Sequence, residues 1–191
     1  METLLKKLES EISKRNIPDF KIAEIIQDNK DLISRRIITG YASVDVVDRE
    51  RQRIPISALK NAVKLFMENA YYRPINVFHS DVTIGRILQK WTNPKTGQIY
   101  ETKVDDKGWL VVCELRDDID IANKVWNEVV KGNLRCFSIA GTSKDKLYKH
   151  ENGQDYEQVN SLEIYEATVC AMGVNQLSRF DIAWNPEKVS I

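Results

Sequence analysis

Histidine and cysteine are scarce in this chain, which has two of the former and three of the latter in 191 residues. The cysteines are odd in number, scattered along the chain and set in apolar stretches: Cys113, Cys136 and Cys170. Such residues are typical of small buried hydrophobes and not of a disulfide framework. Neither residue type occurs with the spacing of zinc ligands. We therefore expect no disulfides, no structural metal and no cofactor.

An excess of charge of one sign is also missing, because 28 Lys and Arg balance 28 Asp and Glu. This balance argues against a nucleic-acid binder held by a general basic field, although a local patch is compatible with it. No apolar run approaches the length that spans a bilayer, and the N-terminus lacks the apolar core of a signal peptide. We expect a cytosolic protein whose partners include neither nucleic acid nor a membrane.

The chain does have enough apolar residues, 42% of the total, to bury the core of one domain with a small appendage. The appendage is predicted at residues 1–33, as a helical arm broken by Pro18. Its apolar residues recur at intervals of three and four: Leu4, Leu5, Leu8 and Ile12. The main domain is then predicted to cover residues 34–191.

Two helices stand out in the main domain. The first is predicted over residues 57–72 with Ser57 as N-cap, and its apolar face consists of Leu59, Val63, Phe66 and Met67. The second, over 117–133, would be capped by Asp117 or Asp118 and end at Gly132. About seven strand-like segments surround them without regular alternation, and Asn152-Gly153 marks a hairpin or exposed loop. This pattern indicates an α+β fold built on an antiparallel sheet or barrel.

Three polar residues interrupt three apolar strand-like segments. Ser138 lies in "NLRCFSIAGTSKD", His79 in "INVFHSDVTIGRIL" and Glu166 in "LEIYEATVC". An unpaired polar group is costly to bury, so these side chains need partners, and they could satisfy one another. A serine becomes a nucleophile when a base takes its proton and a third group orients that base. The sequence therefore suggests a Ser138–His79–Glu166 triad.

Other roles compete with this interpretation. Cys136 is a rival nucleophile on the same strand face, but it has bulky neighbours, whereas Ser138 is followed by Ala140 and Gly141, which leave room for a substrate. Asp81 is the rival third member. Taken singly, each of the three residues also has an ordinary structural role, as a solvent-facing strand residue or a turn cap.

Four segments together resemble the tailed-phage prohead (capsid maturation) serine protease family, whose fold is thought to be shared with the herpesvirus assemblins. The resemblance runs from about Tyr41 to about Asp181 and keeps the order of the landmarks. Its segments are "GYASVDVVDRERQRIPISALKNAVKLFM", "PINVFHSDVTIGRI", "KGWLVVCELRDDIDIANKVWNEVVKGNLRCFSIAG" and "LEIYEATVCAMGVNQLSRF". It implies that His79 is the general base, Ser138 the nucleophile and Glu166 the third member.

The chain departs from the family pattern at two places. "FSIAG" inserts Ala140 before the glycine, and "MGVNQLSRF" replaces the "PAN" that commonly follows the acid strand. The first departure affects the backbone around the oxyanion site, whose N–H donors we expect near Ala140, Gly141 or Thr142.

The resemblance also implies a fold and a function. The fold would be an antiparallel β-barrel of about seven strands with flanking helices. The protein would cleave scaffold and major capsid protein inside an assembling prohead in the host cytoplasm. A homodimer is a further possibility, and the helix with Trp126 is the element we would test for it. The main alternative is a catalytically inactive, protease-like module that binds scaffold or capsid; an esterase or amidase of small substrates is a third.

Overall fold

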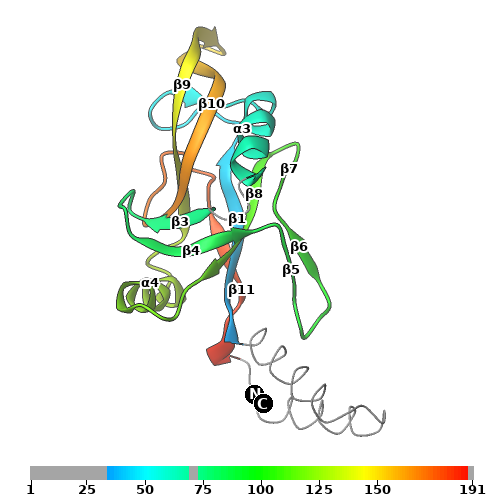
Figure 1. Cartoon of the computed structure of the whole chain (residues 1–191). Coiled ribbons are helices and arrows are strands. Elements are labelled where there is room, and N and C mark those ends of the chain that lie inside the picture. The colour runs from blue at the N-terminus through cyan, green and yellow to red at the C-terminus, as the bar shows by residue number, and fades with distance from the viewer. Residues whose placement is uncertain (1–33, 69–72, 189–191) are drawn as a thin grey trace, which may run out of the picture.

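The structure is a computed structural model that describes residues 34–68 and 73–188 (Figure 1). The predicted arm at residues 1–33 lies outside the described residues. None of the helices described is long and apolar enough to cross a membrane. In chain order the elements are β1 (Arg36–Val44), β2 (Gln52–Arg53), α3 (Ile56–Glu68), β3 (Pro74–Val77), β4 (Thr83–Leu88), β5 (Lys90–Thr92), β6 (Ile99–Glu101), β7 (Lys103–Val104), β8 (Gly108–Leu115), α4 (Asp120–Lys131), β9 (Cys136–Glu151), β10 (Gln154–Cys170), β11 (Phe180–Trp184) and the 3-10 helix η1 (Pro186–Lys188).

Nine strands form one curved, mixed sheet that resembles half of a barrel. Its order is β11-β1-β8-β4-β3-β10-β2, with β7 paired to β8 and β9 paired to β10, while β5 and β6 form a separate ribbon. Strand β10 runs parallel to β2 and to β3, and the other pairs are antiparallel. The predicted antiparallel barrel is therefore corrected to an open, mixed sheet in the described chain. The parallel pairs join residues 92 apart in β3 and β10 and 105 apart in β2 and β10, and no local pattern encodes such a pairing.

Helix α3 packs on the sheet through the predicted face. Its buried residues are Ala58, Leu59, Ala62, Val63 and Phe66, and the Phe66 ring meets the ring of Trp109 edge-on at 5.6 Å. The predicted N-cap is wrong, because the helix begins at Ile56 and Ser57 lies inside its first turn. Asp45 instead accepts a hydrogen bond from the backbone N–H of Ile56 at 3.1 Å. A residue eleven positions away thus caps the helix.

Helix α4 ends as predicted and begins differently. Gly132 has a φ of 85° at the C-cap, a left-handed conformation that glycine adopts at little cost. At the other end the N-cap is Ile119, which makes no side-chain capping bond. Neither predicted aspartate caps the helix, and Asp118 instead receives two hydrogen bonds from Arg116, at 2.8 and 2.7 Å.

Trp126 of α4 lies in the core of its own chain. Its side chain is fully buried and the Arg36 guanidinium stacks 5.6 Å from the ring centroid. We expect Trp126→Ala to lower the free energy of unfolding by about 3–5 kcal/mol, because it leaves a large cavity. Denaturant titration measures this loss, with the exposed Ile121→Ala on the same helix as a control that should change little. Near wild-type stability of Trp126→Ala would contradict this packing.

Strands β9 and β10 form a long hairpin that extends beyond the rest of the sheet (Figure 1). Asn152 and Gly153 connect them with φ values of 53° and 73°, which confirms the predicted hairpin turn. Ser138 and Glu166 lie toward the opposite end from this turn, where β10 also pairs with β3. Three strands therefore meet around the predicted site.

Candidate functional site

A row of three polar residues crosses the sheet where β3, β10 and β9 are adjacent. Thr168 of β10 lies opposite Ser138 of β9 on one side and beside Asn76 of β3 on the other. The residues before and after each of them belong to, or pack against, the hydrophobic core. Because side chains alternate along a strand, the three members of this polar row share the other face of the sheet. All three are nonetheless buried.

His79 sits in a tight turn directly after β3. Phe78 and His79 both have a φ of 52°, and the turn closes with a hydrogen bond from Ser80 N–H to Val77 O at 3.0 Å. The backbone N–H of His79 donates to the hydroxyl of Thr168 at 3.1 Å. Two successive bulky residues at positive φ are strained, and such strain concentrates at functional sites. The turn thus ties His79 to the middle of the polar row.

The structure brings His79 and Glu166 into direct contact. His79 Nδ1 lies 2.8 Å from Glu166 Oε1. The Glu166 side chain is 14% exposed and that of His79 is 42% exposed. An ionised carboxylate can only accept, so neutral His79 carries its proton on Nδ1 and leaves the Nε2 lone pair available. This arrangement suits a base whose tautomer is fixed by a carboxylate.

Ser138 lies on the same sheet face as this pair. Glu166 is two residues from Thr168 along β10, and Ser138 is opposite Thr168, so all three predicted side chains emerge on one side. Within the described residues no hydrogen bond joins the Ser138 hydroxyl to His79. In resting enzymes such bonds are often long and tighten only when substrate is bound.

The rival residues are placed differently. Asp81 is exposed, and the carboxylate that meets His79 is that of Glu166. Cys136 lies opposite Cys170, whose thiol is 3.6 Å from the Cys136 carbonyl oxygen, and both cysteines are free. Burial raises the pKa of Cys170 to about 11, so this neighbour stays a neutral thiol at physiological pH. In the described part of the chain, no hydrogen bond or ion pair joins either rival side chain to His79 or Glu166.

The backbone beside Ser138 offers donors along an open edge of β9. Phe137 N–H points away from β10, since it donates to Ser178 O at 3.0 Å. By strand alternation the N–H groups of Ile139 and Gly141 point the same way, where no described strand pairs with β9 at these positions. Of the three predicted oxyanion donors, the N–H of Gly141 points to this open side. The N–H groups of Ala140 and Thr142 point toward β10. The sequence did not predict the N–H of Ile139 as a further oxyanion donor, because only the strand pairing decides which N–H groups are free.

A cavity of about 450 Å³ lies beside this edge, and we call it the β9 groove. Residues 138–143 of β9 line it, together with Ser43, Asp48, Glu50 and Asn175 from other segments. The groove therefore joins the Ser138 position to the open backbone edge. An extended segment lying in it could bond to free N–H groups of the strand.

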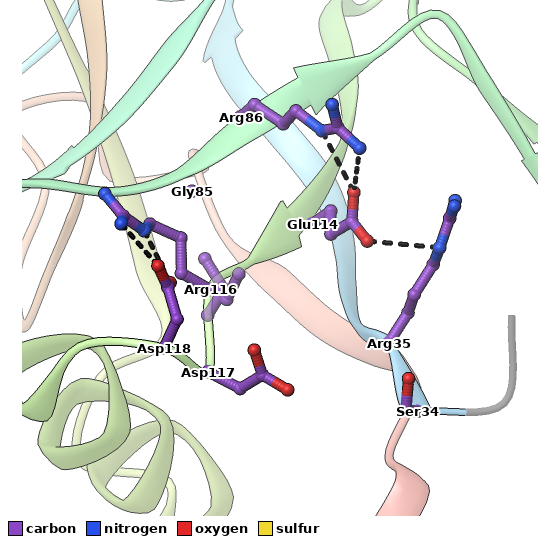
Figure 2. Close-up of a pocket in the computed structure, with 9 residues that line it drawn as sticks. Ser34, Arg35, Gly85, Arg86, Glu114, Arg116, Asp117 and Asp118 are labelled. Carbon is purple, nitrogen blue, oxygen red and sulfur yellow. Dashed lines mark hydrogen bonds and ion pairs between the residues drawn. The ribbon is translucent and has the colours of Figure 1, made fainter. Parts of the chain in front are cut away.

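A second cavity of about 440 Å³ is lined by charged side chains (Figure 2). Glu114 accepts from Arg86 at 3.0 and 2.8 Å and forms an ion pair with Arg35 at 3.2 Å. Arg116 and Asp118 pair with each other at the other side of this cavity. These charges neutralise one another, and none of the three predicted site residues lines this cavity, whereas Ser138 lines the β9 groove. The β9 groove is therefore the better candidate for a reactive site.

Comparisons with known proteins find similarity to phage proteases. Residues 21–146 match the model of the family described as "Putative phage serine protease XkdF", a match that includes His79 and Ser138 and ends before Glu166. The chain is 28% identical over 148 residues to a prohead protease of Escherichia phage T5, covering 76% of this chain and 62% of that protein. It thus spans less than two thirds of that relative. The structure of the bacteriophage T4 capsid assembly protease, gp21, is similar with a TM-score of 0.49 and 14% identity over 69% of this chain and 80% of that one.

Proposed function

Because the chain belongs to the phage serine protease family whose model matches residues 21–146, we propose that it is a serine endopeptidase of prohead maturation. The observation that carries the proposal is the 2.8 Å contact between His79 and Glu166 on the sheet face that also bears Ser138. The name of the T5 relative, a prohead protease, supports the biological setting.

In the proposed reaction, Ser138 Oγ attacks the carbonyl carbon of the scissile peptide while His79 Nε2 takes the hydroxyl proton. The C–N bond then breaks, and His79 returns the proton to the leaving amine. Water releases the acyl group from Ser138 by the same steps in reverse order. His79 is exposed enough to meet a substrate, as a group that exchanges protons with it must be.

Glu166 has the role of orienting and stabilising the base. Its carboxylate holds the Nδ1–H tautomer of His79 and favours the imidazolium that forms during attack. Because the Glu166 side chain is mostly shielded from water, this interaction is screened less than a surface ion pair. Asp81, being exposed, is not needed in this scheme.

The oxyanion would be stabilised by N–H groups on the open edge of β9. Gly141 N–H, with Ile139 N–H beside it, faces the side without a partner strand. A positioned backbone donor of this kind contributes about 3 kcal/mol to transition-state stabilisation. A side chain at Gly141 would disturb the site, since a Cβ there comes 2.4 Å from Glu163 O.

The proposed substrates are extended segments of the scaffold protein and the major capsid protein, cut inside the assembling prohead in the host cytoplasm. The β9 groove supports this class, since it lies along an open strand edge that can pair with substrate backbone. Flexible segments of shell proteins can adopt the extended form that such pairing requires.

Co-expression with a scaffold protein and a major capsid protein of the virus that encodes this chain tests the proposal. Mass spectrometry of protein N-termini should find new termini in both proteins when the wild-type chain is present. These termini should be missing with the double variant Ser138→Ala/His79→Ala. The alternative, a non-catalytic shell module, is favoured by the lack of a Ser138–His79 hydrogen bond. It predicts identical termini in both cultures and normal shells with either chain, a result that would overturn the protease assignment.

A further inference from the structure

Asn76 is an unusual residue for the centre of β3. Its strand neighbours Ile75 and Val77 belong to the hydrophobic core, and Asn76 itself is 7% exposed. An apolar β-branched residue would suit a buried strand better, because a buried amide must find hydrogen-bond partners for both of its ends. The partners it has found therefore indicate why it is there.

Both ends of the Asn76 amide are engaged. Its Nδ2 donates to Glu166 Oε2, and its Oδ1 accepts from the Thr83 hydroxyl at 3.0 Å. The orientation of the amide is fixed chemically, since an ionised carboxylate only accepts and must face the NH₂ group. Thr83 then holds the other end from the adjacent strand β4.

The consequence for Glu166 is that both of its oxygens are held. Oε1 meets His79 Nδ1 and Oε2 meets Asn76 Nδ2, so the carboxylate cannot rotate without losing a bond. Both donors lie at or directly after β3, which sits beside the Glu166 strand. The carboxylate is thereby oriented from one neighbouring strand.

We propose that Asn76 is a positioning residue that, aligned by Thr83, locks the Glu166 carboxylate so that it holds the Nδ1–H tautomer of His79. That Asn76 matters for catalysis rests on the proposed function. The tautomer it predicts is a property of the resting protein and can be measured without any substrate.

The first test is ¹⁵N NMR of the histidine rings in wild type and Asn76→Val. The chain has two histidines, so His150, whose Nδ1 lies 2.6 Å from Asp155 Oδ1, serves as an internal reference. In wild type, neutral His79 should be mainly the Nδ1–H form. In Asn76→Val it should shift toward the Nε2–H form that an unconstrained histidine side chain prefers, while His150 stays unchanged. An unchanged His79 tautomer in the folded variant would overturn the proposal.

The second test is the rate at which a fluorophosphonate labels Ser138. Asn76→Val should label about 100-fold more slowly, the cost of a catalytic group displaced by about 1 Å. Thr83→Val keeps the Asn76 donor but removes the bond that aligns the amide, so it should show a smaller loss of labelling rate and a partial shift of the His79 tautomer. If Asn76→Val does not fold, Thr83→Val provides the test in its place. Asn160→Val, which removes a β10 asparagine bonded to Asp145 at 3.4 Å, should change neither readout.

The two tests separate failure of this inference from failure of the protease assignment. If wild type is not labelled at all, the proposed chemistry fails, while the tautomer shift still decides whether Asn76 orients Glu166. If wild type is labelled and both Asn76→Val and Thr83→Val match it in rate and tautomer, the positioning role is wrong and the protease assignment stands.

Discussion

Replacing Ser138 by alanine is expected to abolish cleavage, with a fall in kcat/KM of about 10⁶-fold, the size seen when a serine nucleophile is removed from a triad. The hydroxyl is the atom that bonds to the scissile carbonyl, and no other described side chain in the polar row can replace it. Asn76 carries an amide, and the Thr168 hydroxyl is already bonded to the backbone of His79. The measurement is the rate of appearance of new termini in a co-expressed or purified capsid substrate.

Two neighbours provide matched controls for Ser138→Ala. Cys136→Ala removes the rival nucleophile on the same strand face, and Ser161→Ala removes an exposed serine from the paired strand β10. Both should keep wild-type rates, because among the described residues no hydrogen bond or ion pair links either side chain to His79 or Glu166. Cleavage that survives in Ser138→Ala but disappears in Cys136→Ala would move the nucleophile to the cysteine.

Replacing His79 by alanine should cost about as much as losing the serine, again about 10⁶-fold, because triad members act as a unit. Without the imidazole the Ser138 hydroxyl keeps its proton at neutral pH, and the leaving amine receives none. Glu166→Gln should have a smaller effect of about 10⁴-fold, since the base is then present in the wrong tautomer. The measurement is single-turnover cleavage with enzyme in excess, which isolates the chemical step.

His150 gives an internal comparison for this variant. It also contacts a carboxylate, with Nδ1 2.6 Å from Asp155 Oδ1, but it lies near the tip of the β9–β10 hairpin. His150→Ala should therefore leave the cleavage rate unchanged. Equal losses in His79→Ala and His150→Ala would mean that both histidines act through stability and not through catalysis.

Local features of the fold could be predicted from the sequence, and long-range features could not. The left-handed Gly132 and the Asn152-Gly153 turn follow from backbone preferences of single residues, so their positions were predicted correctly. The helix N-caps were not, because Asp45 reaches α3 from another segment and Asp118 is engaged by Arg116. The parallel pairing of β3 with β10 depends on the whole core, and the residue pattern of a strand does not indicate which strand will pair with it.

The same distinction applies to the candidate site. Polar residues in apolar segments are a visible signal, and the structure brings His79, from the turn after β3, into contact with Glu166 of β10. Asn76 gave the same signal in the same segment as His79 and was overlooked, although it holds the other oxygen of the carboxylate. The free N–H groups of β9 had no sequence signal at all, since they depend on which side of the strand is paired.

The central claim is that Ser138 is activated by the His79–Glu166 pair, and covalent labelling tests it most directly. Wild-type protein treated with a fluorophosphonate and mapped by tandem mass spectrometry should carry the label on Ser138. In His79→Ala the labelling rate should fall by several orders of magnitude. Label on another residue, or on Ser138 at the same rate without His79, would contradict the account.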